Sequence, residues 1–429
     1  MSEYSHEFYP EWTDRATIYE VNLRQYSLSG SLSVFESHLP RLKEMGIDIL
    51  WFMPVTPIGI EDRKMGPADL GSYYAVKNYY QFSHEFGTME EWKLLVSKMH
   101  DMGFKVIIDW VANHTAPDHP WTTFHTEFYI RDDSGKILPP NSDWTDTRQL
   151  DFNNGEMRTA MIDAMSYWIR ETDIDGFRCD MAKLIPPDFW SEAIKKLRTY
   201  KDILLIAEGE DQGYYQAGFN AQYTWSLFHA LTDLYRGNKS LDDILQIINS
   251  NESLGPGFRL TFTSNHDENT WNGTEADLFG DAVKCFTVLN FTMNEALPMI
   301  YSGQEAGNKK RLSFFTKDVI AWDSFERSEF YKSLISLRKT HISFNINSTN
   351  QRVATSNDTC IYSYLKEYQE DKVLIILNMS KFNQQISICE QQAFGKVVNY
   401  FTNEEITLNI DSSIKLDSWG YLIFTYPTL

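Results

Sequence analysis

The chain has 429 residues, 42% of them hydrophobic, which is enough for one large domain of about 250 residues or more and a smaller one. Its 39 basic and 59 acidic residues give a formal net charge of −20, and an acidic surface repels phosphate backbones, so nucleic acid is excluded as an expected partner. No stretch approaches the roughly 18 consecutive apolar residues of a membrane span, so no membrane partner is expected.

Short apolar runs alternate with stretches of helical periodicity along most of the chain. Seven such runs predict buried strands, at residues 17–25, 47–54, 104–111, 174–180, 203–208, 258–267 and 297–303. Their near-continuous hydrophobicity is typical of a parallel sheet covered on both faces. The clearest helix is predicted over residues 87–103, where Thr88 and Glu91 have capping-box spacing and Gly103 lies where a helix would stop. This alternation predicts an α/β fold.

Two parts of the chain depart from this alternation. Residues 115–154 are rich in Asp, Pro, His and aromatic residues and have no helical period, which predicts a small subdomain inserted after the third strand. Beyond residue 343, short alternating segments predict an antiparallel β-domain. The predicted division is residues 1–114 and 155–342 for the main domain, 115–154 for the insert and 343–429 for the C-terminal domain.

Single acidic residues end four of the predicted strands. They are Asp109, Asp180, Glu208 and Asp267. The C-terminal ends of the strands of a parallel barrel converge on one mouth, so these carboxylates are expected to meet there. A lone acid in such a place is more often a loop residue or a helix cap, whereas four on successive strands indicate a site. Glycoside hydrolysis with retention needs two carboxylates about 5–5.5 Å apart, one ionised and one protonated.

The segments that carry these acids resemble the signature regions of glycoside hydrolase family 13, the α-amylase family. They are DWVANHT (109–115), GFRCDMAKL (176–184), AEGE (207–210) and FTSNHD (262–267). The resemblance implies a (β/α)8 TIM barrel with a small inserted subdomain after strand 3 and a C-terminal antiparallel β-domain. It also implies a retaining glycoside hydrolase that cleaves α-1,4-glucosidic bonds of starch-derived glucans or maltooligosaccharides by double displacement. The expected partner is therefore such a glucan.

The resemblance also implies roles for the three acids that follow β-strand runs in these segments. Asp180 is implied to be the nucleophile, Glu208 the general acid/base, and Asp267 the third acid, which binds sugar hydroxyls. From the residues themselves, Arg178 lies two positions before Asp180 on the same strand face, and its cation is expected to keep Asp180 ionised. The apolar residues before Glu208 are expected to raise the pKa of that acid.

Further residues are implied to bind the substrate. His114 and His266 resemble the histidines that hydrogen-bond the reacting sugar, and Tyr74 resembles the tyrosine that stacks beneath it. Lys183 matches a lysine on the leaving-group side, and the alternative for it is a solvated residue at a helix start. The histidine that commonly follows this lysine is Leu184 here, which predicts acceptor subsites that differ from those of typical amylases.

No cofactor is required by this chemistry, but many members of the family bind a structural calcium ion. Asn113 matches the usual barrel ligand, whereas Gln149 occupies the place of the usual acidic ligand from the insert. A neutral amide is a poorer ligand for a hard dication. Asp143, Asp146 or Asp151 are alternative ligands, and the balance of residues is against a calcium site.

Two alternative functions stay open. A glucanotransferase or isomerase would use the same site, with a sugar in place of water as the acceptor. A non-catalytic glucan-binding protein is the other, and the intact set of three acids argues against it.

The four cysteines form no CxxC pair, and the first residues lack a basic stretch followed by an apolar core, so a cytoplasmic location is predicted. The oligomeric state is unknown from the sequence.

Overall fold

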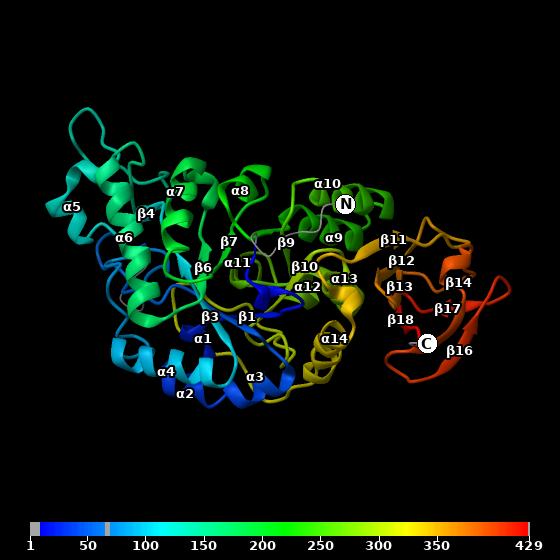
Figure 1. The fold of residues 1–429 in the computed structure, drawn as a ribbon. Coiled ribbons are helices and arrows are strands. Elements are labelled where there is room, and N and C mark those ends of the chain that lie inside the picture. The colour runs from blue at the N-terminus through cyan, green and yellow to red at the C-terminus, as the bar shows by residue number, and fades with distance from the viewer. Residues whose placement is uncertain (1–8, 65–68, 428–429) are drawn as a thin grey trace.

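The computed structural model describes residues 9–64 and 69–427, and its central feature is a closed barrel of eight parallel strands (Figure 1). The barrel strands are β1 (Ile18–Val21), β2 (Ile49–Phe52), β3 (Lys105–Trp110), β6 (Gly176–Cys179), β7 (Leu204–Ala207), β8 (Ala221–Tyr223), β9 (Phe258–Thr261) and β10 (Ala296–Tyr301). They pair in this order around the ring, and β10 pairs with β1 to close it. The predicted α/β barrel is confirmed.

Helices surround this barrel, and most of them cover the outer faces of its strands (Figure 1). They are α1 (Leu23–Tyr26), α2 (Leu32–Glu36), α3 (Leu39–Met45), α4 (Met89–Asp101), α6 (Gly155–Thr172), α7 (Pro187–Leu197), α8 (Gln212–Ala217), α9 (Trp225–Arg236), α10 (Leu241–Glu252), α11 (His266–Trp271), α12 (Glu275–Phe279), α13 (Val283–Thr292) and α14 (Ser328–Thr340). The predicted helix is confirmed as α4, because Thr88 and Glu91 make both hydrogen bonds of a capping box.

The strands are apolar throughout because both of their faces are covered. In β2 and β7 all four residues are buried, one face toward the barrel interior and the other toward the helices. The eighth strand, β8, is outside the seven predicted runs. It has only three residues, and its middle residue is Gln222, so the sequence carries no apolar run long enough to predict a strand there.

The segment inserted after β3 contains little regular structure. Its strands β4 (His114–Thr115) and β5 (Arg148–Gln149) form an antiparallel pair, and α5 (Pro120–Phe124) projects beyond them at the edge of the barrel (Figure 1). The sequence shows no helical period here, but α5 forms because a proline stands in its first turn and the side chain of His119 accepts a hydrogen bond from the Trp121 backbone N–H. This short helix was absent from the sequence prediction.

The C-terminal part is antiparallel, as predicted. A six-stranded sheet has the order β11-β12-β13-β18-β15-β16, and β14 pairs with β17 beside it. The bounds are β11 (Thr349–Arg352), β12 (Ile361–Tyr368), β13 (Asp371–Asn378), β14 (Gln384–Ile386), β15 (Gly395–Asn399), β16 (Glu405–Leu408), β17 (Ile414–Leu416) and β18 (Tyr421–Thr425). The exact divisions at residues 114, 154 and 342 stay a prediction.

Alternate residues of the long sheet strands face opposite sides, and both sides are apolar. Tyr364 and Ile375 belong to the large core of the barrel and its helices, whereas Leu365 and Leu374 belong to a separate core under the β14–β17 pair. The sheet therefore packs directly on the barrel.

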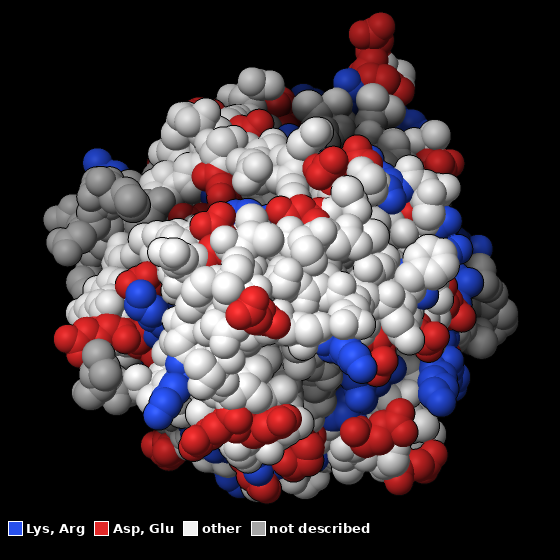
Figure 2. Space-filling model, turned by 90° about the vertical axis from the view of Figure 1, so that its right-hand side faces the viewer, with Lys and Arg blue, Asp and Glu red and all other residues white. Residues whose placement is uncertain are grey.

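Figure 2 shows the outer side of this region, where both signs of charge lie around an area of uncharged atoms. Within residues 9–64 and 69–427, no helix combines the length and apolarity needed to cross a bilayer.

Candidate active site

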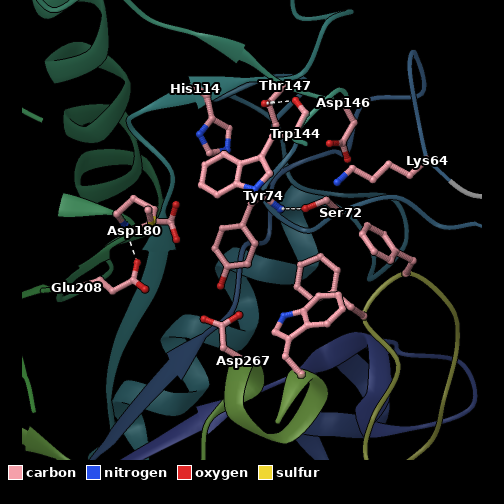
Figure 3. Close-up of a pocket in the computed structure, with 14 residues that line it drawn as sticks. Lys64, Ser72, Tyr74, His114, Trp144, Asp146, Thr147, Asp180, Glu208 and Asp267 are labelled. Carbon is pink, nitrogen blue, oxygen red and sulfur yellow. Dashed lines mark hydrogen bonds between the residues drawn. The ribbon is translucent and has the colours of Figure 1, made fainter. Parts of the chain in front are cut away.

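The C-terminal ends of the barrel strands open on a cavity of about 520 Å³ that contains all three implied catalytic acids (Figure 3). Asp180 follows β6, Glu208 follows β7, and Asp267 lies in the first turn of α11, shortly after β9. These positions are far apart in the sequence, and the parallel strands bring them to one mouth. The implied substrate-binding residues Tyr74 and His114 line the same cavity.

One buried guanidinium holds three carboxylates beneath this cavity. Nη1 of Arg178 lies 2.9 Å from Asp109 Oδ1 and 2.8 Å from Asp180 Oδ1, and Nη2 lies 3.1 Å from Glu208 Oε2. The arginine side chain is fully buried. Asp180 and Glu208 are therefore neighbours fixed on the same cation, and Asp109, the fourth acid found at a strand end, supports that cation from β3.

The close approach of β6 to β7 sets this spacing. Gly176 begins β6 with φ of +151°, and a Cβ atom placed there would lie 1.9 Å from the backbone oxygen of Leu204 in β7. No side chain fits in that space, so glycine is required. The backbone also supports Glu208 directly, because the N–H of Met181, which has φ of +46°, donates to Glu208 Oε2 at 2.6 Å.

The surroundings of Asp180 act on its pKa in opposite directions. Burial and the neighbouring Glu208 raise the pKa of Asp180 well above its ordinary value, and Arg178 opposes that rise. Arg178 acts in the expected direction, and the expectation that it keeps Asp180 ionised stays a prediction.

Tyr74 and His266 form a hydrogen-bonded group next to Asp267. The Tyr74 hydroxyl donates to Asp109 Oδ2 at 3.1 Å and lies 2.5 Å from His266 Nε2, which is also 3.4 Å from Asp267 Oδ2. The rings of Tyr74 and His266 are stacked with centroids 5.7 Å apart. The other ring nitrogen, Nδ1, lies 2.5 Å from Oε1 of Glu20 in β1.

Glu20 was missed by the sequence analysis, because it lies inside a predicted strand and not at its end. The available signal was an acid in the middle of an otherwise apolar run, which predicts a buried carboxylate in need of a partner. The cavity also contains aromatic residues that the sequence analysis did not single out. They are Trp271 from α11, and Phe314 and Phe315 from the loop after β10, whereas Trp144 comes from the insert whose aromatic residues were expected to form a wall of the site.

His114 differs from His266 in charge. It is buried, its Nδ1 lies 3.2 Å from the side-chain nitrogen of Asn113, and its ring is 5.5 Å from that of Trp144. Burial lowers the pKa of His114 to about 4, so its imidazole is neutral at ordinary pH. Lys183, by contrast, is exposed after β6 and does not line the cavity, so the structure does not bring it into this group.

Asn113, the possible calcium ligand, is engaged in hydrogen bonds within the chain. Its side-chain nitrogen faces His114, and its backbone carbonyl accepts a hydrogen bond from Leu150 N–H at 3.1 Å. Calcium takes about six to eight oxygen ligands. In the described part of the chain, no three His, Cys, Asp or Glu side chains are grouped so as to hold a metal ion.

The catalytic-domain model of the α-amylase family matches residues 9–146 and 141–359, which include every residue of the cavity. The chain belongs to the α-amylase family. It is 28% identical to the maltogenic α-amylase AmyB of Thermotoga neapolitana, with a TM-score of 0.87 over 96% of this chain and 98% of that one. It is 26% identical to an α-amylase of Lactobacillus plantarum, with a TM-score of 0.85 over 96% and 99% of the two chains.

A curated relative, α-amylase MalA of Haloarcula japonica, is 26% identical over 396 residues. The match covers 86% of this chain and 56% of MalA, so this member of the family spans little more than half the length of that relative.

Proposed function

We propose that this α-amylase family member is a retaining glycoside hydrolase that cleaves α-1,4-glucosidic bonds of maltooligosaccharides or starch-derived glucans. The observation that carries the proposal is the placement of Asp180 and Glu208 on the two nitrogens of one buried arginine, at the edge of a cavity that also contains Asp267. Two adjacent carboxylates sharing one proton are what a double displacement requires.

In the first step the proton of the pair is on Glu208, which donates it to the glycosidic oxygen while the ionised Asp180 attacks the anomeric carbon. The bond to the leaving sugar breaks, and a covalent glycosyl ester forms on Asp180. In the second step Glu208, now ionised, takes a proton from water, and that water attacks the same carbon. The ester bond breaks, Asp180 leaves as a carboxylate, and the product keeps the α configuration.

Other side chains position the sugar in this scheme. The Tyr74 ring is the stacking surface between the acids and the rim, where Lys64 and Asp146 lie opposite Asp180 and Glu208 (Figure 3). The neutral His114 and the carboxyl group of Asp267 supply a hydrogen-bond donor and an acceptor to hydroxyl groups. Because Glu208 protonates the leaving oxygen, the leaving sugar lies on the Glu208 side, and the rest of the donor chain extends toward Trp271, Phe314 and the rim.

The test is the reaction of the purified protein with maltotriose, followed by proton NMR. The α anomer of the new reducing end is expected first, and it mutarotates later. Initial release of the β anomer, or no cleavage of maltotriose, soluble starch or an α-glucoside chromogen, contradicts the proposal. Oligosaccharides longer than maltotriose would identify transfer to sugar in place of hydrolysis. The Asp180→Asn variant is the matched control. The cytoplasmic location stays a prediction.

A further inference from the structure

The carboxylate of Glu20 is completely buried and has one partner. Its Oε1 lies 2.5 Å from His266 Nδ1, whereas Oε2 is buried with no hydrogen-bond partner among the described residues. A buried carboxylate with a hydrogen bond to only one of its oxygens destabilises the fold unless the partner is a cation. Glu20 contributes to no step of the mechanism above, and it does not line the cavity.

The hydrogen bonds around His266 identify the state of its ring. The Tyr74 hydroxyl has one proton, which it donates to Asp109 Oδ2 at 3.1 Å, so it accepts from His266 Nε2. Burial raises the pKa of Asp109 to about 6 against the effect of Arg178, so above that pH the carboxylate is only an acceptor. Ionised Glu20 is likewise only an acceptor, and it faces Nδ1. Both ring nitrogens of His266 therefore carry protons.

We propose that Glu20 is a positioning residue, which holds His266 as a doubly protonated cation and aims its Nε2–H at a substrate hydroxyl. The inference rests on the proposed function for the role of that hydroxyl. When a sugar enters, Nε2–H turns from the Tyr74 oxygen to the ligand, while Nδ1–H stays on Glu20 and prevents the ring from rotating. A charge-assisted donor is stronger than a neutral one, so a doubly protonated His266 holds the sugar hydroxyl more firmly in place than a neutral ring would.

The charges around the pair agree with this assignment. Burial lowers the pKa of His266, but Asp267 and Glu20 outweigh it and raise the value to about 9. Burial raises the pKa of Glu20, and the contact with His266 opposes that rise. The other titratable groups that face the pair from neighbouring elements are Arg178 of β6, Asp109 of β3, Tyr74, Tyr223 of β8 and Tyr301 of β10.

The first measurement is an NMR titration of the whole enzyme made with isotope-labelled histidine, without substrate. The His266 signal is assigned as the one missing from a His266→Gln variant. Both ring nitrogens are expected to be protonated at about pH 7.5 and to titrate near pH 9. A ring that is neutral on either nitrogen at about pH 7.5 in the wild-type protein overturns the proposal, and this result needs no variant of Glu20 and no activity.

The second measurement compares Glu20→Gln with Glu305→Gln. Glu305 is an equally buried carboxylate close to β1, but it accepts hydrogen bonds from Tyr19 and pairs with Arg41. In Glu20→Gln the pKa of His266 is expected to fall by at least about one unit, toward its ordinary value near 6.5. In Glu305→Gln the titration of His266 is expected to be unchanged. Equal titration of His266 in Glu20→Gln and wild type overturns the proposal.

Activity separates positioning from a merely structural effect. The ratio of kcat/KM between wild type and Glu20→Gln is expected to grow as pH rises from about 6 to about 8, about twofold if the pKa of His266 in the variant is near 8 and about tenfold if it is near 7, because the variant loses the His266 proton over that range. A ratio that stays constant with pH is the structural outcome and contradicts the role. If the wild type cleaves no glucoside, the proposed function fails, and the NMR titration still decides whether Glu20 holds the cation.

Discussion

At the scale of single residues, the two acids on Arg178 carry the chemistry. We expect Asp180→Asn and Glu208→Gln each to lower kcat on maltooligosaccharides about 1,000-fold or more, because one removes the nucleophile and the other the proton donor. Both variants keep the shape of the side chain and an oxygen that accepts from Arg178. Their melting temperatures, measured by circular dichroism, are expected to stay within a few degrees of the wild type.

The nucleophile is tested separately by azide. In Asp180→Ala a small anion fits beside the anomeric carbon, so azide is expected to restore turnover and to yield the β-glycosyl azide. Rescue of the α product instead, or parental rates in Asp180→Asn, would remove Asp180 from this role.

Trp271 is the exposed aromatic residue of the cavity, with 51% of its surface accessible and its ring 5.2 Å from that of Phe314. We expect Trp271→Ala to raise KM for maltotetraose about tenfold, which corresponds to about 1.4 kcal/mol of lost stacking, with little change in kcat. Steady-state kinetics check this. Phe382→Ala is the matched control, because Phe382 is 62% exposed and lies in the C-terminal domain. An equal effect of both substitutions contradicts the assignment of Trp271.

At the scale of elements, a cluster around Asp175 joins α4, β3 and β6 below the barrel. The buried carboxylate accepts from His100 Nε2 at 2.7 Å, Val106 N–H at 2.9 Å and Lys105 Nζ at 3.2 Å, and Lys201 Nζ lies 2.9 Å away. Burial by itself raises the pKa of Asp175, but His100, Val106 and Lys201 lower it to about 2. The carboxylate therefore stabilises the fold only while it is ionised.

This shift predicts a pH dependence of stability. Because the folded pKa is below the unfolded value of about 3.9, the contribution of Asp175 is fully present above about pH 4 and is lost as pH falls through about 2. We expect Asp175→Asn to lower the free energy of unfolding by about 3 kcal/mol at pH 7, and by much less near pH 2, in urea titrations. The exposed Asp202→Asn is the control, with an expected change below about 0.5 kcal/mol.

The elements also show what the sequence could and could not predict. Seven barrel strands were predicted because each is an apolar run covered on both faces, and α4 was predicted from its caps. Strand β8 was missed because three residues around a glutamine carry no such signal, and only closure of the barrel requires a strand there. The three acids were predicted from strand ends. Glu20 was not, because its role depends on a contact with a residue 246 positions away.

At the scale of the whole molecule, the C-terminal sheet is attached to the barrel across a buried face that includes a lysine. Lys366 of β12 is 2% exposed, and its ammonium lies 5.5 Å from the Phe344 ring. Burial and the nearby Arg338 lower the pKa of Lys366 to about 7, against the effect of Glu252 on α10. Near neutral pH and below, the ammonium of Lys366 is therefore buried without full solvation in the contact between the sheet and the barrel, which destabilises the fold.

The effect of Lys366 on the free energy of unfolding at neutral pH is opposite in sign to that of Asp175, because the charged lysine destabilises the fold whereas the charged aspartate stabilises it. Between about pH 7 and 10.4 the lysine is protonated in the unfolded chain but neutral in the folded protein. The free energy of unfolding therefore rises with pH over that window because of Lys366. We expect Lys366→Met to raise the free energy of unfolding by about 1–4 kcal/mol at pH 6, and the gain to fade by about pH 10, in calorimetry. Lys372→Met, a partly exposed neighbour paired with Glu367, is expected to change little at either pH.

The join between β10 and β1 has a consequence for the nascent enzyme. Asp180 and Glu208 are both present once about half of the polypeptide has been synthesised, yet His266 and the strand that completes the ring come later. A chain that ends soon after Glu208 therefore contains the two main acids but lacks His266, Asp267 and the strands that close the ring. We therefore expect that closure of the barrel between β10 and β1 is required for activity and that shorter fragments are inactive.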